Sequence, residues 1–115
     1  MGNAYTNAKK DLTSTSVTTL YTAPSLTTSI VKSILVSEDS GNADTITLTL
    51  TDAESSPSTF SLFKTKSISA NGTTELLTAP LVLKTGEILK VTAATANRLH
   101  VVLSALEIKP RTVTS

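Results

Sequence analysis

The segment from Asp44 to Asp52, DTITLTLTD, alternates strictly between aliphatic and threonine side chains. Successive side chains of a β-strand point to opposite faces of the sheet, so this period of two predicts a strand with one apolar and one polar face. The polar face of a soluble strand usually carries mixed charges. This one would instead carry uncharged, β-branched residues: Thr45, Thr47, Thr49 and Thr51.

Segments of the same kind recur along the chain, and turn residues separate them at intervals of roughly 8–12 residues. The predicted strands are 17–22, 29–37, 44–52, 59–68, 74–78, 88–94 and 99–108, with a further short one at 81–83. This spacing is typical of antiparallel β-sandwiches. We therefore expect an all-β, jelly-roll-like antiparallel β-sandwich of about seven or eight strands.

The two ends of the chain lack this pattern. Residues 1–16 are polar and are predicted to form an N-terminal extended arm without a strand of its own. Residues 17–109 are predicted to form the β-sandwich domain, and residues 110–115 a C-terminal tail. The first residues contain no apolar run of the kind found in secretory signals, so none is expected.

The apolar positions of the predicted strands provide a candidate core. It consists of Ile30, Ile34, Val36, Ile46, Leu48, Leu50, Phe60, Leu62, Ile88, Val91, Val101, Leu103 and Leu106. Asn71-Gly72 lies between two strand patterns and predicts a hairpin with a type I′ turn. The segment TTLYTAP at 18–24 is echoed by TTELLTAP at 73–80. Such an echo arises from two related halves, from equivalent corners of a sandwich, or by chance in a threonine-rich chain.

Composition argues against several classes of partner and site. Charged residues make up 17% and the formal net charge is +1, which gives no electrostatic reason to expect nucleic acid or membrane as a partner. The chain has no cysteine and one histidine, so neither a disulfide nor a zinc site is expected. Aromatic residues are 3%, with no tryptophan, which leaves few stacking groups for nucleic acid or sugar.

No constellation of catalytic residues is visible in the sequence. His100 lies inside a predicted strand with no nucleophilic elbow in the chain, so we predict no catalytic residue and no enzyme activity. The carboxylates of Glu38, Asp39, Asp44, Asp52 and Glu54 gather around one predicted hairpin. Calcium binding is conceivable there, but EDSGNAD lacks the EF-hand spacing, so a solvated turn is the preferred interpretation. We therefore expect no metal and no cofactor.

The threonine face is the positive signal that remains. Threonine side chains are stiff, lose little entropy when ordered and can hydrogen-bond, which suits a surface pressed against other protein. The alternative is that threonine was selected only for its strand propensity. On the first interpretation, the candidate protein-interaction residues are Thr45, Thr47, Thr49, Thr51 and, on the N-terminal arm, Tyr5.

Four short motifs carry a resemblance that spans roughly residues 12–108. They are Tyr21-Thr22-Ala23-Pro24, Ile30-Val31-Lys32-Ser33-Ile34, Gly86-Glu87-Ile88-Leu89-Lys90-Val91 and Leu106-Glu107-Ile108. In these motifs the chain resembles small β-rich virion proteins of tailed bacteriophages. It departs from their pattern at Glu38-Asp39, where asparagine is common, and at Asn71, where alanine is common.

The resemblance implies a non-enzymatic structural protein located in the virion and assembled in the host cytoplasm. The leading expectation is a capsid decoration or cement protein that stabilises the phage head. The alternatives are a tail or neck component, such as a fibre, spike or adaptor module, and, less favoured, a carbohydrate-binding module. The implied partners are the major capsid protein or tail proteins and further copies of the chain in a homo-trimer, with no nucleic acid and no membrane.

Overall fold

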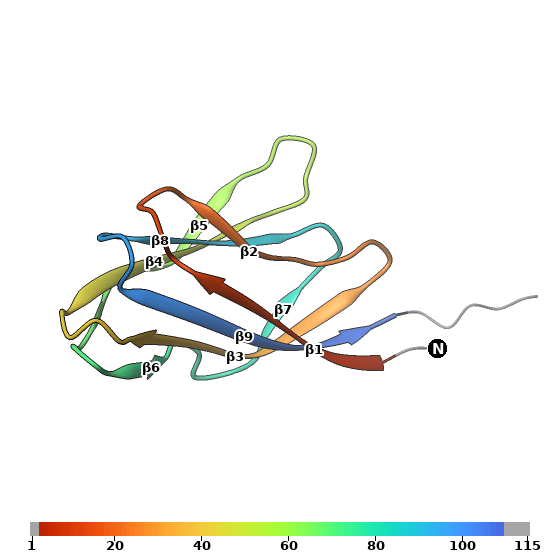
Figure 1. The fold of residues 1–115 in the computed structure, drawn as a ribbon. Coiled ribbons are helices and arrows are strands. Elements are labelled where there is room, and N and C mark those ends of the chain that lie inside the picture. Colours follow the sequence, from red (N-terminus) through yellow and green to blue (C-terminus); the bar gives the residue numbers. More distant parts are fainter. Residues whose placement is uncertain (1–2, 110–115) are drawn as a thin grey trace, which may run out of the picture.

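The computed structural model describes residues 3–109, and these form nine β-strands and no helix (Figure 1). The strands are β1 (Asn3–Asp11), β2 (Thr18–Thr22), β3 (Thr28–Glu38), β4 (Asp44–Thr51), β5 (Thr59–Ile68), β6 (Thr73–Glu75), β7 (Leu81–Leu83), β8 (Ile88–Ala93) and β9 (Leu99–Ile108). The all-β prediction is confirmed. Within the described part of the chain, no helix is present that could cross a membrane.

The strands form two antiparallel sheets that lie face to face (Figure 1). The first sheet has the order β1-β9-β3-β6, with β7 also paired to β3, and the second sheet has the order β2-β8-β4-β5. If β6 and β7 are counted together as one interrupted sixth strand, β8 becomes the seventh strand and β9 the eighth. The strand orders of the two sheets are then 1-8-3-6 and 2-7-4-5. This is the strand order of a jelly roll, so the predicted sandwich and its topology agree with the structure.

The repeated segment occupies comparable corners of the two sheets. Residues 18–24 contain β2, the edge strand of the second sheet, and residues 73–80 contain β6, an edge strand of the first sheet. Their matching leucines, Leu20 and Leu76, are both buried, at 4% and 3% exposure. Each of the two segments thus includes an edge strand, in a different sheet.

The core lies between the sheets and follows the alternation of the strands. Seven of the predicted core residues are fully buried: Ile34, Val36, Ile46, Leu48, Val91, Val101 and Leu103. Leu50 packs only partly against them. The prediction is wrong for Phe60 and Leu62, which are exposed on the edge strand β5 at 52% and 37%.

It is also wrong for three residues that point away from the core. Ile88 and Leu106 are each an odd number of positions from a buried residue of the same strand, and a strand turns such positions to opposite faces. Ile30 is an even number of positions from Ile34, but a bulge between Val31 and Ser33 reverses the alternation of β3. All three are half-buried on outer faces.

The N-terminal segment differs from the prediction most. Residues 3–11 form β1, which pairs with β9 at nine positions, so an arm without a strand is wrong for these residues and the sandwich starts at Asn3. Backbone pairing needs no apolar side chain, and both faces of β1 are largely exposed, so its sequence shows no alternation. The predicted tail, residues 110–115, lies outside the described residues.

The turn before β6 is not of type I′. That type requires a positive φ at both central residues, whereas Asn71 has a φ of 56° and Gly72 has no positive φ. The amide of Gly72 donates to the carbonyl of Ser69 at 2.9 Å, which closes a turn one residue earlier than predicted.

Candidate interaction surfaces

The threonine face is the outer surface of β4, in the interior of the second sheet between β8 and β5. Ile46 and Leu48 point into the core, so the alternating threonines point outward. All four are half-buried: Thr45, Thr47, Thr49 and Thr51. The structure therefore brings these predicted residues together in one row.

Flanking strands extend this row into a wider surface. The side chains paired with the threonines on β8 and β5 are mostly small and hydroxylated: Thr92, Thr59, Ser61, Ser67, Ile88 and Lys90. Two of the hydroxyl groups are used within the sheet. Thr51 Oγ1 and Thr59 Oγ1 lie 3.0 Å apart, and the amide of Thr65 donates to Thr47 Oγ1 at 3.1 Å.

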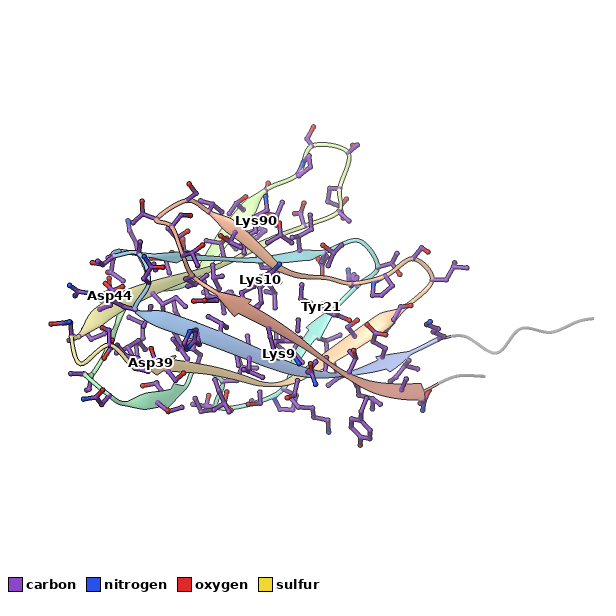
Figure 2. The ribbon with its side chains drawn as sticks, in the orientation of Figure 1. Lys9, Lys10, Tyr21, Asp39, Asp44 and Lys90 are labelled. Carbon is purple, nitrogen blue, oxygen red and sulfur yellow. The ribbon has the colours of Figure 1, made fainter. Side chains whose placement is uncertain are left out.

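Lys90 puts a positive charge on this surface that β4 alone did not reveal. It lies opposite Thr49 on the neighbouring strand β8 (Figure 2). Lys90 lies beside Thr49 because β8 pairs with β4, and the sequence pattern does not predict which strand pairs with β4. The surface is therefore weakly basic.

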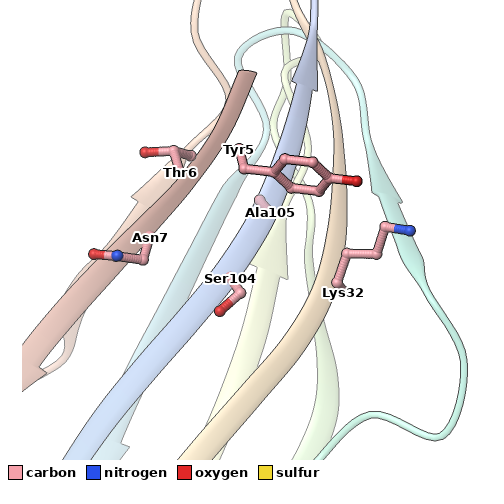
Figure 3. Close-up of a pocket in the computed structure, with 6 residues that line it drawn as sticks. All are labelled: Tyr5, Thr6, Asn7, Lys32, Ser104 and Ala105. Carbon is pink, nitrogen blue, oxygen red and sulfur yellow. The ribbon is translucent and has the colours of Figure 1, made fainter. Parts of the chain in front are cut away.

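Tyr5 lies elsewhere, on the outer face of the first sheet. It is 79% exposed, and its ring reaches over β9 toward Lys32 on β3 (Figure 3). An open hollow of about 400 Å³ lies here, lined by Tyr5, Thr6, Asn7, Lys32, Ser104 and Ala105. The candidate interaction residues thus divide between two opposite faces of the sandwich.

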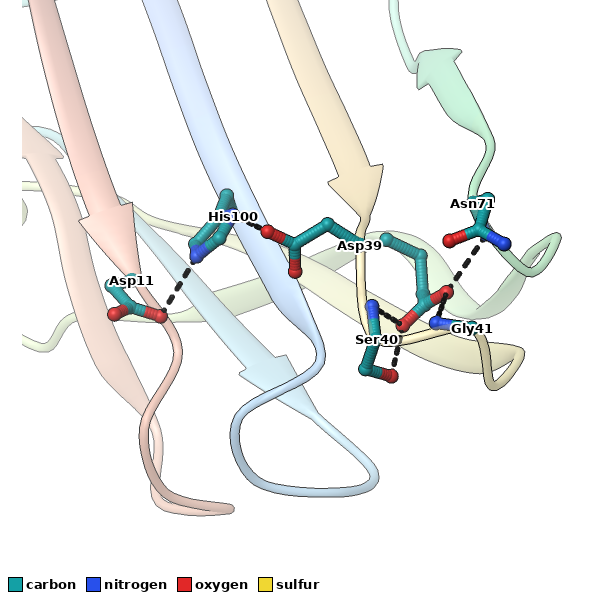
Figure 4. Close-up of polar contacts among 7 residues, drawn as sticks. Asp11, Asp39, Ser40, Gly41, Asn71 and His100 are labelled. Atoms are coloured by element: carbon teal, nitrogen blue, oxygen red, sulfur yellow. Dashed lines mark hydrogen bonds and ion pairs between the residues drawn. The ribbon is translucent and has the colours of Figure 1, made fainter.

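His100 connects β1 to the rest of the first sheet. Its Nε2 lies 3.2 Å from Asp11 Oδ1, and its Nδ1 lies 3.5 Å from Asp39 Oδ2 (Figure 4). Both ring nitrogens thus face carboxylates, and a protonated imidazole would donate to both. This arrangement gives the histidine a structural role at the end of β1.

Glu38 organises the loop that follows β3. Its carboxylate accepts hydrogen bonds from the amide and hydroxyl of Ser40, from the amide of Gly41 at 3.1 Å and from the amide of Asn71 at 2.9 Å (Figure 4). The residue is 2% exposed, so the expectation of a solvated turn is wrong for Glu38. Burial alone would raise the pKa of this carboxyl, but the hydrogen bonds from Ser40 and Asn71 outweigh it and lower the pKa to about 2.

The Glu38→Gln variant is expected to show this linkage as a pH-dependent loss of stability. A depressed pKa stabilises the folded state fully above the ordinary value of 4.5, and the contribution is lost as the pH falls toward 2. Thermal unfolding should therefore show a lower Tm for the variant near neutral pH, and the two Tm values should converge across that acid interval. A difference that stays constant over the whole interval would contradict this assignment.

The other carboxylates of this region do not converge with Glu38. Asp44 Oδ2 accepts from the amide of Thr95 at 3.0 Å, and Asp52 Oδ1 accepts from the amides of Glu54 and Ser58 at 3.3 and 3.0 Å. Among residues 3–109 no group of three or more acidic, histidine or cysteine side chains is arranged to hold a metal ion. These carboxylates order turns through backbone amides.

A partly buried trio of polar side chains joins the sheets near the opposite end of the sandwich. The Tyr21 hydroxyl donates to Glu107 Oε2 at 2.5 Å and lies 2.7 Å from Ser29 Oγ. Burial and then the hydrogen bond to Glu107 raise the pKa of Tyr21 to about 12. The trio joins the two sheets. No local sequence signal links its members, because Ser29 and Glu107 lie 8 and 86 residues from Tyr21.

Comparison with the models of known protein families finds no match, and no curated protein matches the sequence. The function is therefore inferred from the surfaces described above together with the sequence motifs.

Proposed function

We propose that this protein is a non-enzymatic structural protein of a phage virion, a capsid decoration or cement protein that binds the major capsid protein and stabilises the head. The observation that carries the proposal is the threonine face, an ordered row of uncharged side chains on the outer surface of the sandwich, held by a strand in the interior of the second sheet. The resemblance of the motifs around Tyr21, Ile30 and Gly86 to virion proteins supports it.

The chemistry of the threonine face suits a contact that many copies repeat. Threonine has few rotamers to lose, and no charge on β4 between Thr45 and Thr51 has to be desolvated. A symmetric shell holds its subunits in register, so a modest free energy per contact is enough for full occupancy. Lys90 at the flank adds attraction for an acidic partner surface.

Copy number per particle distinguishes a head protein from the alternative, a tail or neck component. A shell protein follows the symmetry of the capsid and is present in hundreds of copies, whereas a tail or neck component is present in about six to eighteen. Quantitative mass spectrometry of purified particles measures this number.

A Thr45→Glu, Thr49→Glu double variant should fold and yet bind particles poorly. Among residues 3–109 the hydroxyl groups of Thr45 and Thr49 have no hydrogen-bond partner, so the fold loses no hydrogen bond there. On contact, the carboxylate at position 45 would be desolvated without a partner, which costs several kcal/mol. The carboxylate at position 49 would neutralise Lys90 opposite it and remove the attraction of that cation for an acidic partner surface. We expect occupancy on particles lacking the protein to fall at least about tenfold.

The matched control is Thr13→Glu, Thr15→Glu, which places the same charge in the exposed loop between β1 and β2. It should bind like the unmodified protein. If the variant on the threonine face reaches full occupancy, that face is ordinary solvated strand surface and the proposed contact is wrong.

A further inference from the structure

The outer face of the first sheet carries apolar side chains in rows that cross its strands. Strand register aligns one residue from each of β1, β9, β3 and β7 in the first row: Tyr5, Leu106, Ile30 and Val82. A second row crosses β1, β9, β3 and β6: Lys9, Val102, Leu35 and Glu75. The first row is wholly apolar, and the second has a cation at one end and an anion at the other.

These rows leave much apolar surface open to solvent. Tyr5 is 79% exposed, Val82 56% and Leu35 40%, and the three other apolar members are half-buried by their neighbours. A polar strip that contains Asn7, Ser104 and Lys32 separates the two rows. Exposed apolar surface of the kind that each row forms marks an interaction site. It also explains why Ile30 and Leu106 have apolar side chains although neither points into the core.

We propose that this face binds the same face of a second copy of the chain, across a two-fold axis that runs parallel to the strands between β9 and β3. Such an axis exchanges the two ends of each row. Tyr5 then packs over Val82 of the second copy, and Leu106 packs over Ile30 of the second copy. Lys9 faces Glu75 of the second copy, and because the contact is isologous this ion pair occurs twice.

The order of charges in the second row selects this axis over the alternative. An in-plane axis perpendicular to the strands, placed so that the two rows meet, would put Tyr5 over Lys9 and Val82 over Glu75. Lys9 would then lose water without gaining a partner, which costs several kcal/mol. The Glu75 carboxylate, which accepts from the Ser33 hydroxyl and from the amides of Ile34 and Leu77 in its own chain, would gain no cation. Within the two rows, the parallel axis matches apolar with apolar and cation with anion.

Size and shape fit such a dimer. Four strands about 4.8 Å apart and the ten residues of β9 at about 3.4 Å each give a projected face on the order of 650 Å² per copy. A standard interface buries about 800 Å² per partner. Lys32 lies between the two rows, opposite Ser104 of the second copy, and its long side chain can reach solvent. Aligned sandwich sheets pack about 10 Å apart in this manner.

This pairing does not depend on the proposed role in a virion. A homo-trimer, as the sequence resemblance implies, uses a heterologous contact between different patches, whereas here one patch meets itself. The two arrangements give different masses in solution.

Sedimentation velocity on the full chain tests the pairing, at concentrations up to about 200 µM, where an interface of this size is expected to be populated. The expected species has twice the 12.0 kDa mass of the chain. Val82→Asp should make it monomeric. Thr92→Asp, which puts the same charge on the outer face of the second sheet, should leave it dimeric.

Two further outcomes bear on the assignment. Lys9→Glu changes an exposed side chain, so it cannot unfold the core, and it should weaken dimerisation at least about tenfold by facing Glu75. A zero-length carbodiimide should link Lys9 to Glu75 only between copies, because within one chain they stand three strand spacings apart, about 14 Å. A monomer at every concentration, a trimer, or a dimer that Thr92→Asp dissociates and Val82→Asp does not would overturn the proposal.

Discussion

Replacing Leu103 by alanine is expected to lower the free energy of unfolding by about 2–5 kcal/mol. Leu103 lies on the inner face of β9 with no exposed surface, in the middle of the first sheet. The substitution removes buried aliphatic groups and leaves a cavity that the surrounding strands fill only in part. Urea denaturation followed by circular dichroism measures the change from the shift of the midpoint.

Leu106→Ala is the matched control, three residues further along the same strand. Leu106 lies on the outer face and is half-buried, so its truncation should cost about 1 kcal/mol for the area that it covers. Both variants should be measured at a concentration where the chain is monomeric, because Leu106 lies in the proposed dimer contact. Equal losses at the two positions would mean that the two faces of β9 are not distinguished as the structure describes.

The contrast between these leucines shows where sequence reasoning reaches its limit. The strict alternation of aliphatic and threonine residues predicts β4. The predicted bounds of β5 and β9 agree with the structure to the residue, because turn residues flank both strands. The bounds of a strand do not determine which of its two faces points into the core. Leu103 and Leu106 are equally apolar, and only the even spacing to Val101 assigns Leu103 to the core.

Bulges and pairings carry even less local signal. The bulge between Val31 and Ser33 turns Ile30 outward, and no motif in SIVKSILVS predicts this bulge. The same limit applies to the surfaces. Alternation put the four threonines of β4 on one face, but the position of Tyr5 depends on β1 pairing with β9, about a hundred residues away in sequence.

Glu38 shows this non-locality for a single side chain. In EDSGNAD it resembles a solvated turn residue, and its neighbours Ser40 and Gly41 are local partners that such a turn provides. Its burial requires the β5–β6 turn as well, where Asn71 donates from 33 positions away. The sequence contains both the loop after β3 and the β5–β6 turn, but no local pattern predicts that the two lie side by side.

The amides of β1 are expected to exchange with solvent at least about a hundredfold faster than those of the β3–β9 pair. β1 has backbone pairing along its whole length but little buried side-chain surface, since only Ala8 packs against the core. Net stabilisation by a hydrogen bond is about 1 kcal/mol, which is comparable to the entropy lost in ordering one residue. Pairing alone therefore holds β1 weakly.

Protection should rise along β1 toward its C-terminal end. From Asn3 to Asn7 only Thr6 is even half-buried, whereas Asp11 lies against His100, and the following residue Leu12 is 2% exposed. The amide of Leu12 donates to the Leu99 carbonyl at 3.0 Å, and its carbonyl accepts from the amide of Asn97 at 2.9 Å. Leu12 thus anchors β1 to the sandwich, and the strand should open from the opposite end.

Native-state hydrogen exchange followed by NMR measures this gradient residue by residue. The Leu12→Ala variant should erase it by freeing the anchor, so that all of β1 exchanges quickly while β3 and β9 stay protected relative to β1. The experiment should be carried out at a low protein concentration, because the proposed dimer covers Tyr5 and Lys9 and would slow the opening of β1. If the amides of β1 instead exchange at the rate of the β3–β9 pair, the strand opens only with the whole domain, and its polar sequence is held by more than backbone pairing.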